Sequence, residues 1–131
     1  MDEAALIDAN DAYYRAFAAR DLGAMNDLWA EEGCSCVHPG WPALVGRAAV
    51  LASYRDIFRN PTQEAVTARD PQTLIEGDDG RVFCVEEVGG GLLLATNWFR
   101  WSGERWRLVH HQASPLAPPP SARREGKQSF H

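Results

Sequence analysis

The chain is poor in cysteine, and it has neither a long apolar run nor an excess of basic residues. Its three cysteines, Cys34, Cys36 and Cys84, are an odd number without Cys-x-x-Cys spacing, so we expect reduced thiols and a cytoplasmic protein. No apolar run approaches the roughly 20 residues that span a bilayer, and the start at Met1 lacks the basic and apolar regions of a signal peptide. With 18 acidic and 13 basic residues, the net charge of −5 disfavours binding to nucleic acid or to an anionic membrane.

The length and composition are those of one globular domain. The 131 residues are 45% hydrophobic and 24% charged, which is enough apolar material to bury a core. Apolar residues recur at helical spacing in three segments, and Asp21 is placed to cap the start of the second. The three segments are residues 3–20, a short stretch from 21 to about 31, and residues 46–59.

Strand patterns separated by short turns fill most of the remaining chain, at residues 34–37, 66–75, 81–88, 91–101 and 106–114. Pro71 marks the second of these as an edge strand or a broken strand. Because alternate side chains of a strand face the same side, one row on each of the last two strands should line a half-buried pocket. The expected inward rows are Leu93, Ala95, Asn97, Phe99 and Trp101, and then Trp106, Leu108, His110, Gln112 and Ser114, with His111 facing outward.

Helices grouped before hairpin-linked strands predict an α+β fold. We expect a cone-shaped, strongly bent antiparallel sheet with the three N-terminal helices packed on its concave face. The mouth of such a cone is the natural ligand site. The domain should cover residues 1–116, and residues 117–131, which contain three consecutive prolines, should form a flexible tail.

Three segments carry a resemblance to a known family: residues 13–29, residues 37–50, and the stretch from Ala95 through the sequence Trp-Arg-Leu-Val-His-His-Gln-Ala-Ser that ends at Ser114. Together they resemble the nuclear transport factor 2-like superfamily, which includes SnoaL-like proteins, over essentially residues 3–116. The last segment is similar to the association domain of calcium/calmodulin-dependent protein kinase II. The resemblance implies the fold and leaves the function open, because this fold hosts isomerases, dehydratases, cyclases, hydrolases and assembly modules.

Within this superfamily, a comparison with ketosteroid isomerase indicates three candidate catalytic residues. Segment by segment, the positions of its base, its oxyanion tyrosine and its protonated acid are held here by His38, Tyr13 and Asn97. A histidine base and an amide in place of an acid disfavour steroid isomerisation. His38 could instead hold an irregular loop, and Tyr13 could be a core tyrosine. Asn97, an amide among apolar neighbours, needs hydrogen-bond partners or water, which makes it a pocket candidate.

Several further residues are candidates for contact with a ligand. Aromatic side chains could form a pocket wall or simply the core. His110 should project inward, and Glu86 should be a solvated charge or a charge at the pocket rim. A metal site of His38, His110 and Glu86 has no ligand spacing to support it, so we expect neither metal nor cofactor. The ligand-binding candidates are Trp29, Trp41, Tyr54, Phe58, Glu86, Phe99 and His110.

The outward row of strand 91–101 predicts a partner. Leu92, Leu94, Thr96 and Trp98 would expose an apolar stripe on a monomer, and relatives pair through this face, so we expect a homodimer through the outer sheet face. Two hypotheses for the function remain. The first is a binding module for a small hydrophobic molecule, or an assembly module, without chemistry. The alternative is a cofactor-independent isomerase-, dehydratase- or cyclase-like enzyme, with His38 as acid/base and Tyr13 and Asn97 orienting an oxygen.

Overall fold

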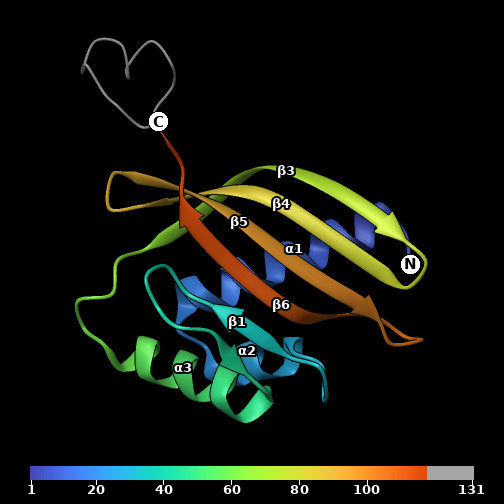
Figure 1. Ribbon diagram of the computed structural model, residues 1–131, viewed down its shortest axis with the longest axis horizontal. Coiled ribbons are helices and arrows are strands. Elements are labelled where there is room, and N and C mark those ends of the chain that lie inside the picture. Colours follow the sequence, from blue (N-terminus) through green and yellow to red (C-terminus); the bar gives the residue numbers. More distant parts are fainter. Residues whose placement is uncertain (118–131) are drawn as a thin grey trace.

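A computed structural model describes residues 1–117, in which three helices pack against one six-stranded sheet (Figure 1). The predicted tail, residues 117–131, lies outside the described residues except for its first residue. The sheet is strongly bent but not closed, and α1 crosses behind it while α2 and α3 lie beyond β1. The elements are α1 (Glu3–Ala19), α2 (Leu22–Leu28), β1 (Ser35–Val37), β2 (Leu44–Val45), α3 (Arg47–Arg59), β3 (Val66–Glu76), β4 (Asp79–Val88), β5 (Gly91–Trp101) and β6 (Trp106–Pro115).

The helix boundaries follow from local capping chemistry. The Asp2 carboxylate accepts a hydrogen bond from the backbone N–H of Ala5 and begins α1. The helix ends at Arg20, which adopts a left-handed conformation with φ of 52°. Asp21 then accepts from the N–H of Ala24 at 3.0 Å, so its predicted role as the cap of α2 is confirmed.

The strand order is β2-β1-β6-β5-β4-β3, and the four long strands that follow α3, β3 to β6, pair in the order in which they occur along the chain. The α+β fold class is confirmed. The paired strands of the sheet are antiparallel except for β1 and β6, which run parallel and are separated in the chain by β2, α3 and the strands β3 to β5. The sequence did not predict this parallel pair. It joins β1, which contacts α3, to β6, the last strand of the sheet in chain order.

The first long strand, β3, is an edge strand, as Pro71 predicts. The pairing with β4 shifts between Arg69 and Gln72, and Asp70 adopts a positive φ of 56°. Proline cannot donate a ladder hydrogen bond, so the irregularity falls where the chain lacks a donor. This break is one of the places at which the sheet can bend.

The central strands alternate as predicted. In β4 the inward residues Val82, Cys84 and Glu86 are buried, and in β5 Ala95, Asn97 and Phe99 are buried. On the outer face of the same sheet, three leucines are more than a third exposed: Leu74, Leu92 and Leu94. Within the part of the chain that the structure describes, no helix is long and apolar enough to cross a membrane.

The alternation predicted for β6 is wrong beyond Leu108. The register with β5 shifts there, since Trp98 pairs with His110 whereas Phe99 pairs with Leu108, so Val109 is an extra residue. A β-bulge of this kind inverts the side on which all following side chains lie. His111 is therefore buried at 3% exposure, and His110 lies on the opposite face, contrary to the prediction.

Candidate functional site

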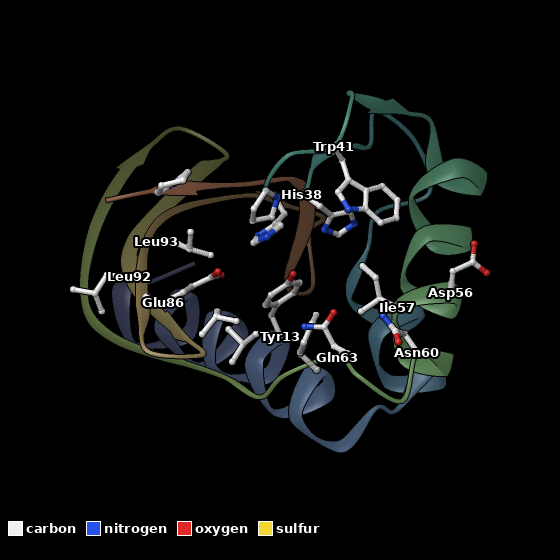
Figure 2. A pocket seen from close by; sticks show the side chains of 17 residues that line it. Tyr13, His38, Trp41, Asp56, Ile57, Asn60, Gln63, Glu86, Leu92 and Leu93 are labelled. Atoms are coloured by element: carbon white, nitrogen blue, oxygen red, sulfur yellow. The ribbon is translucent and has the colours of Figure 1, made fainter. Parts of the chain in front are cut away.

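The concave side of the sheet and helices α1 and α3 enclose a cavity of about 720 Å³ (Figure 2). This volume lies within the range of about 300–1,000 Å³ that is common for small-molecule sites. One part of the cavity lining is polar, a second is apolar, and a third comes from α3 and the loops on either side of it. The polar end consists of Tyr13, His38, Glu86 and His111; the apolar body includes Phe17, Ile57, Val66, Val88 and Leu93; and Trp41, Asp56, Asn60 and Gln63 are the polar and aromatic side chains of α3 and its flanking loops.

A hydrogen-bonded chain beneath the cavity wall connects two of these polar groups. The Tyr14 hydroxyl donates to Oε2 of Glu86 at 2.6 Å and accepts from Nδ2 of Asn97 at 3.0 Å. Asn97 also donates to Oδ1 of Asn10 at 2.8 Å, and its own Oδ1 accepts from Nδ1 of His111 at 2.5 Å. Because Asn97 is fully buried, each of these bonds satisfies a group that water cannot reach. The chain fixes the positions of Glu86 and His111 from behind.

This arrangement determines which nitrogen of His111 faces the cavity. Nδ1 carries the hydrogen that Asn97 Oδ1 accepts, so Nε2 of the neutral ring holds the lone pair. Among residues 1–117, Nε2 has no hydrogen-bond partner. Burial, with smaller contributions from the neighbouring His38 and His110, lowers the pKa of His111 to about 3. His111 is therefore neutral at pH 7 and presents an open acceptor to the cavity.

His38 has an equally defined state. The Ser53 hydroxyl donates to the Val50 carbonyl at 2.6 Å, so it accepts from Nε2 of His38 at 2.9 Å. The lone pair of His38 is then on Nδ1. Burial lowers the pKa of His38 to about 4, so this ring too is neutral at pH 7. Its side chain is 5% exposed, and Trp41 packs edge-on against it with ring centroids 4.9 Å apart.

Tyr13 separates the two ends of the polar region. Its ring stacks on His111 with centroids 4.9 Å apart, and its hydroxyl shares a 2.7 Å hydrogen bond with the hydroxyl of Tyr54. Burial, followed by the nearby Glu86 carboxylate, raises the pKa of Tyr13 well above its ordinary value. The hydroxyl therefore stays protonated, and Figure 2 shows the ring between Glu86 and His38.

The charge around the cavity is negative or absent. Among the described residues that line it, none is a lysine or an arginine, whereas Glu86 and Asp56 are carboxylic acids. Glu86 is 4% exposed, and burial raises the pKa of its carboxyl group, although the hydrogen bond from Tyr14 partly opposes that shift. The polar end is therefore rich in hydrogen-bond acceptors and poor in donors.

The structure brings four of the sequence-predicted site residues to the cavity: Tyr13, His38, Trp41 and Glu86. Asn97 faces inward as predicted, but it lies behind the lining residues and its amide N–H groups are already bonded, so it cannot orient a ligand oxygen directly. We therefore correct its predicted role from contact with a ligand to positioning of His111.

The other predicted wall residues belong to the core or to the far face. Fully buried, Trp29, Tyr54 and Phe99 pack within the core, and Phe58 packs against that core from α3. His110 is not a cavity residue, because its Nδ1 bonds with Ser35 Oγ at 2.7 Å on the other side of β6. The conceivable metal set of His38, His110 and Glu86 is therefore not assembled.

Sequence reasoning missed His111, Tyr14, Asn10 and Ser53. Asn10 and Tyr14 had a usable signal, since they lie four residues apart beside the apolar stripe of α1 and so share its inward face. Ser53 similarly lies one turn after Val50 on the buried face of α3. Nothing local in the sequence indicates the bulge that turns His111 inward.

The bent sheet over three helices and the hollow between them define a class, the nuclear transport factor 2-like proteins. A model of the SnoaL-like domain matches residues 6–118, so the chain belongs to the SnoaL-like family. A solved structure from Streptomyces avermitilis, provisionally assigned as a dehydratase of the NTF2-like family, is 35% identical. It superimposes with a TM-score of 0.77 over 87% of this chain and 95% of that one.

Two further relatives have different assignments. A structure from Thiobacillus denitrificans, provisionally assigned as a calcium/calmodulin-dependent protein kinase type II association domain, is 34% identical. Its TM-score is 0.76 over 83% of this chain and 93% of that one. The F-box protein SKIP8 of Arabidopsis thaliana is 28% identical over 115 residues, which are 86% of this chain; the chain spans half the length of that curated relative.

Proposed function

We propose that the protein binds a small amphipathic molecule in the cavity between α1, α3 and the sheet. The observation that carries the proposal is the combination of an apolar body with a polar end whose acceptors have fixed orientations. A void of this size lined only by apolar groups would offer no orientation to a ligand. Here Nε2 of His111 is held open at one end by the hydrogen bond to Asn97, which is the kind of directed polar group that ligand sites use.

The apolar body supplies most of the affinity in this proposal. Phe17, Val88 and Leu93 present surface that a hydrophobic ligand would remove from water, at about 25 cal/mol for each Å² buried. The acceptors at the polar end contribute specificity, because a ligand without a matching donor would leave them unpaired.

The proposal is tested with a substitution that fills the cavity and leaves the outer surface of the protein unchanged. The neutral fluorescent probe N-phenyl-1-naphthylamine should bind the wild type, and Leu93→Trp, which adds an indole within the cavity, should abolish the fluorescence increase. Leu94→Trp is the matched control, since the neighbouring side chain lies on the outer face and is 42% exposed. Equal loss in both variants, or binding retained in Leu93→Trp, would contradict cavity binding.

A second candidate is proton-transfer catalysis of the dehydratase type. Two observations favour it: two neutral imidazoles line the cavity, of which His111 has an unpartnered Nε2 among residues 1–117, and the S. avermitilis relative carries a provisional dehydratase assignment. In such a reaction His38 or His111 would take a proton from carbon beside a carbonyl. The leaving hydroxyl would depart as water after it receives that proton from the imidazolium.

The enzyme hypothesis is tested with a panel of β-hydroxy carbonyl compounds, in which mass spectrometry detects the loss of one water. His38→Gln retains an N–H donor for Ser53, so it removes the imidazole base with little disturbance of the fold. Turnover that disappears in His38→Gln and in His111→Gln supports catalysis. Unchanged turnover in both variants would remove these residues from the mechanism.

We further propose that the protein forms a homodimer through the outer face of the sheet and acts in the cytoplasm. Exposed Leu92 and Leu94 on β5 support the first proposal, and the three free cysteines support the second. The assembly role that the name of the T. denitrificans relative suggests would use the same face. Light scattering that gives a 14.5 kDa particle at micromolar concentration would contradict the dimer.

A further inference from the structure

The carboxylate of Glu86 is buried in the cavity wall without a cation. Its side chain is 4% exposed, and Figure 2 shows it pointing into the cavity toward Tyr13. Oε2 accepts the hydrogen bond from Tyr14, and Oε1 has no partner among residues 1–117. Arg69, on the neighbouring strand β3, pairs instead with Glu87 and Asp70, whose side chains are exposed.

The remaining polar groups of the cavity do not compensate for this carboxylate. Nε2 of His111 and Nδ1 of His38 are acceptors, as derived above from their fixed partners. The hydroxyl of Tyr13 is already shared with that of Tyr54, so at most one donor remains there. Within the described chain, no lysine or arginine lines the cavity.

Such a site discriminates by charge. A carboxylate removed from water is costly unless a positive partner and hydrogen-bond donors accompany it. A ligand carboxylate would meet like charge and acceptors, whereas an alkylammonium group would bring both the missing charge and up to three N–H donors. The apolar body of the cavity, with Phe17 and Leu93, leaves room for a hydrophobic group behind the ammonium.

We infer that the ligand is an organic cation, an apolar body that ends in a primary or secondary ammonium group which pairs with Glu86. This inference rests on the proposed binding function and narrows it to one class of ligand. The acceptors on His111 and His38 then select ligands with further donors near the ammonium, such as a hydroxyl group.

Isothermal titration calorimetry at neutral pH with three matched probes tests the inference. They share a phenylbutyl body and differ in the terminal group: 4-phenylbutylamine, 4-phenylbutan-1-ol and 4-phenylbutanoate. We expect the amine to bind about tenfold or more tightly than the alcohol, which corresponds to about 1.4 kcal/mol or more. The carboxylate should bind more weakly than the alcohol.

Glu86→Gln keeps an oxygen that can accept from Tyr14 but removes the charge, so the amine should lose its advantage while the alcohol binds as before. Glu87→Gln is the matched control, because it makes the same change one residue along, on the side chain that pairs with Arg69, and it should leave the amine preference intact. Equal affinities of amine and alcohol in the wild type, or an amine preference that survives Glu86→Gln, would overturn the inference and leave the binding function standing. Failure of all three probes and of N-phenyl-1-naphthylamine would overturn both.

Discussion

The substitution Asn97→Leu tests the buried hydrogen-bonded chain with little change in side-chain volume. Asn97 is fully buried and makes three hydrogen bonds of 3.0 Å or shorter, to Asn10 at 2.8 Å, to Tyr14 at 3.0 Å and from His111 at 2.5 Å. Leucine can make none of them. Tyr14 keeps its bond to Glu86, but the Oδ1 of Asn10 and the Nδ1–H of His111 are left buried without a partner.

Each stranded group costs about 1–3 kcal/mol, so two of them should lower the free energy of unfolding by about 2–6 kcal/mol, less a small gain from the more apolar side chain. Urea unfolding with linear extrapolation measures this change. The control is Thr96→Val, an equally isosteric change on the outward side of the same strand, for which we expect a change within about 0.5 kcal/mol.

A loss below about 1 kcal/mol in Asn97→Leu, or a loss equal to that of the control, would refute the reasoning, because water or rearranged side chains would then satisfy both groups. A second measurement tests whether Asn97 fixes the tautomer of His111, independently of its effect on stability. In Asn97→Leu the proton of His111 is no longer held on Nδ1, so nitrogen NMR should detect a shift of the neutral ring toward the Nε2-protonated form.

Three further predictions concern stability and assembly. The pKa values of His38 and His111 are lowered to about 4 and about 3 in the folded protein. Below about pH 6.5 the unfolded chain therefore binds protons that the folded chain does not. As the pH falls, each histidine should lower the free energy of unfolding by about 1.4 kcal/mol per pH unit until its folded pKa is reached. The raised pKa of Glu86 acts in the opposite sense, and urea unfolding at several pH values should give a slope that His38→Gln reduces by one histidine's share. Arg47 donates three hydrogen bonds of 2.7–3.1 Å to carbonyls at the end of α2, so Arg47→Ala should lose about 2–3 kcal/mol in thermal unfolding, and Arg47→Lys less. Leu94→Glu should convert the proposed dimer to a 14.5 kDa monomer in light scattering, and an unchanged particle size would argue against this face.

Most of the fold follows from periodicity and local chemistry. The spacing of Leu6, Tyr13 and Ala16 defines the buried face of α1, and Asp21 and Pro71 mark a helix start and an edge strand. These signals are local, because each depends on residues within one or two turns or on the two faces of one strand. The parallel pairing of β1 with β6 depends instead on where the chain returns after α3, which no local pattern encodes.

The candidate site was only partly predictable for the same reason. Tyr13, His38 and Glu86 lie on segments whose facing could be read from alternation or resemblance, and all three line the cavity. His111, rather than His110, faces the cavity because β6 contains one extra residue, Val109, in its pairing with β5. Whether a strand accommodates such a bulge depends on packing against its partner, so side-chain alternation alone assigns the wrong histidine.

The central claim is that a ligand enters the cavity and meets His111. Intermolecular nuclear Overhauser effects between bound N-phenyl-1-naphthylamine and the protein test it directly. The account predicts contacts from the probe to the ring protons of His111 and Tyr13, and none to the methyl groups of Leu94 on the outer face. Contacts to Leu94 without any to His111 would contradict it.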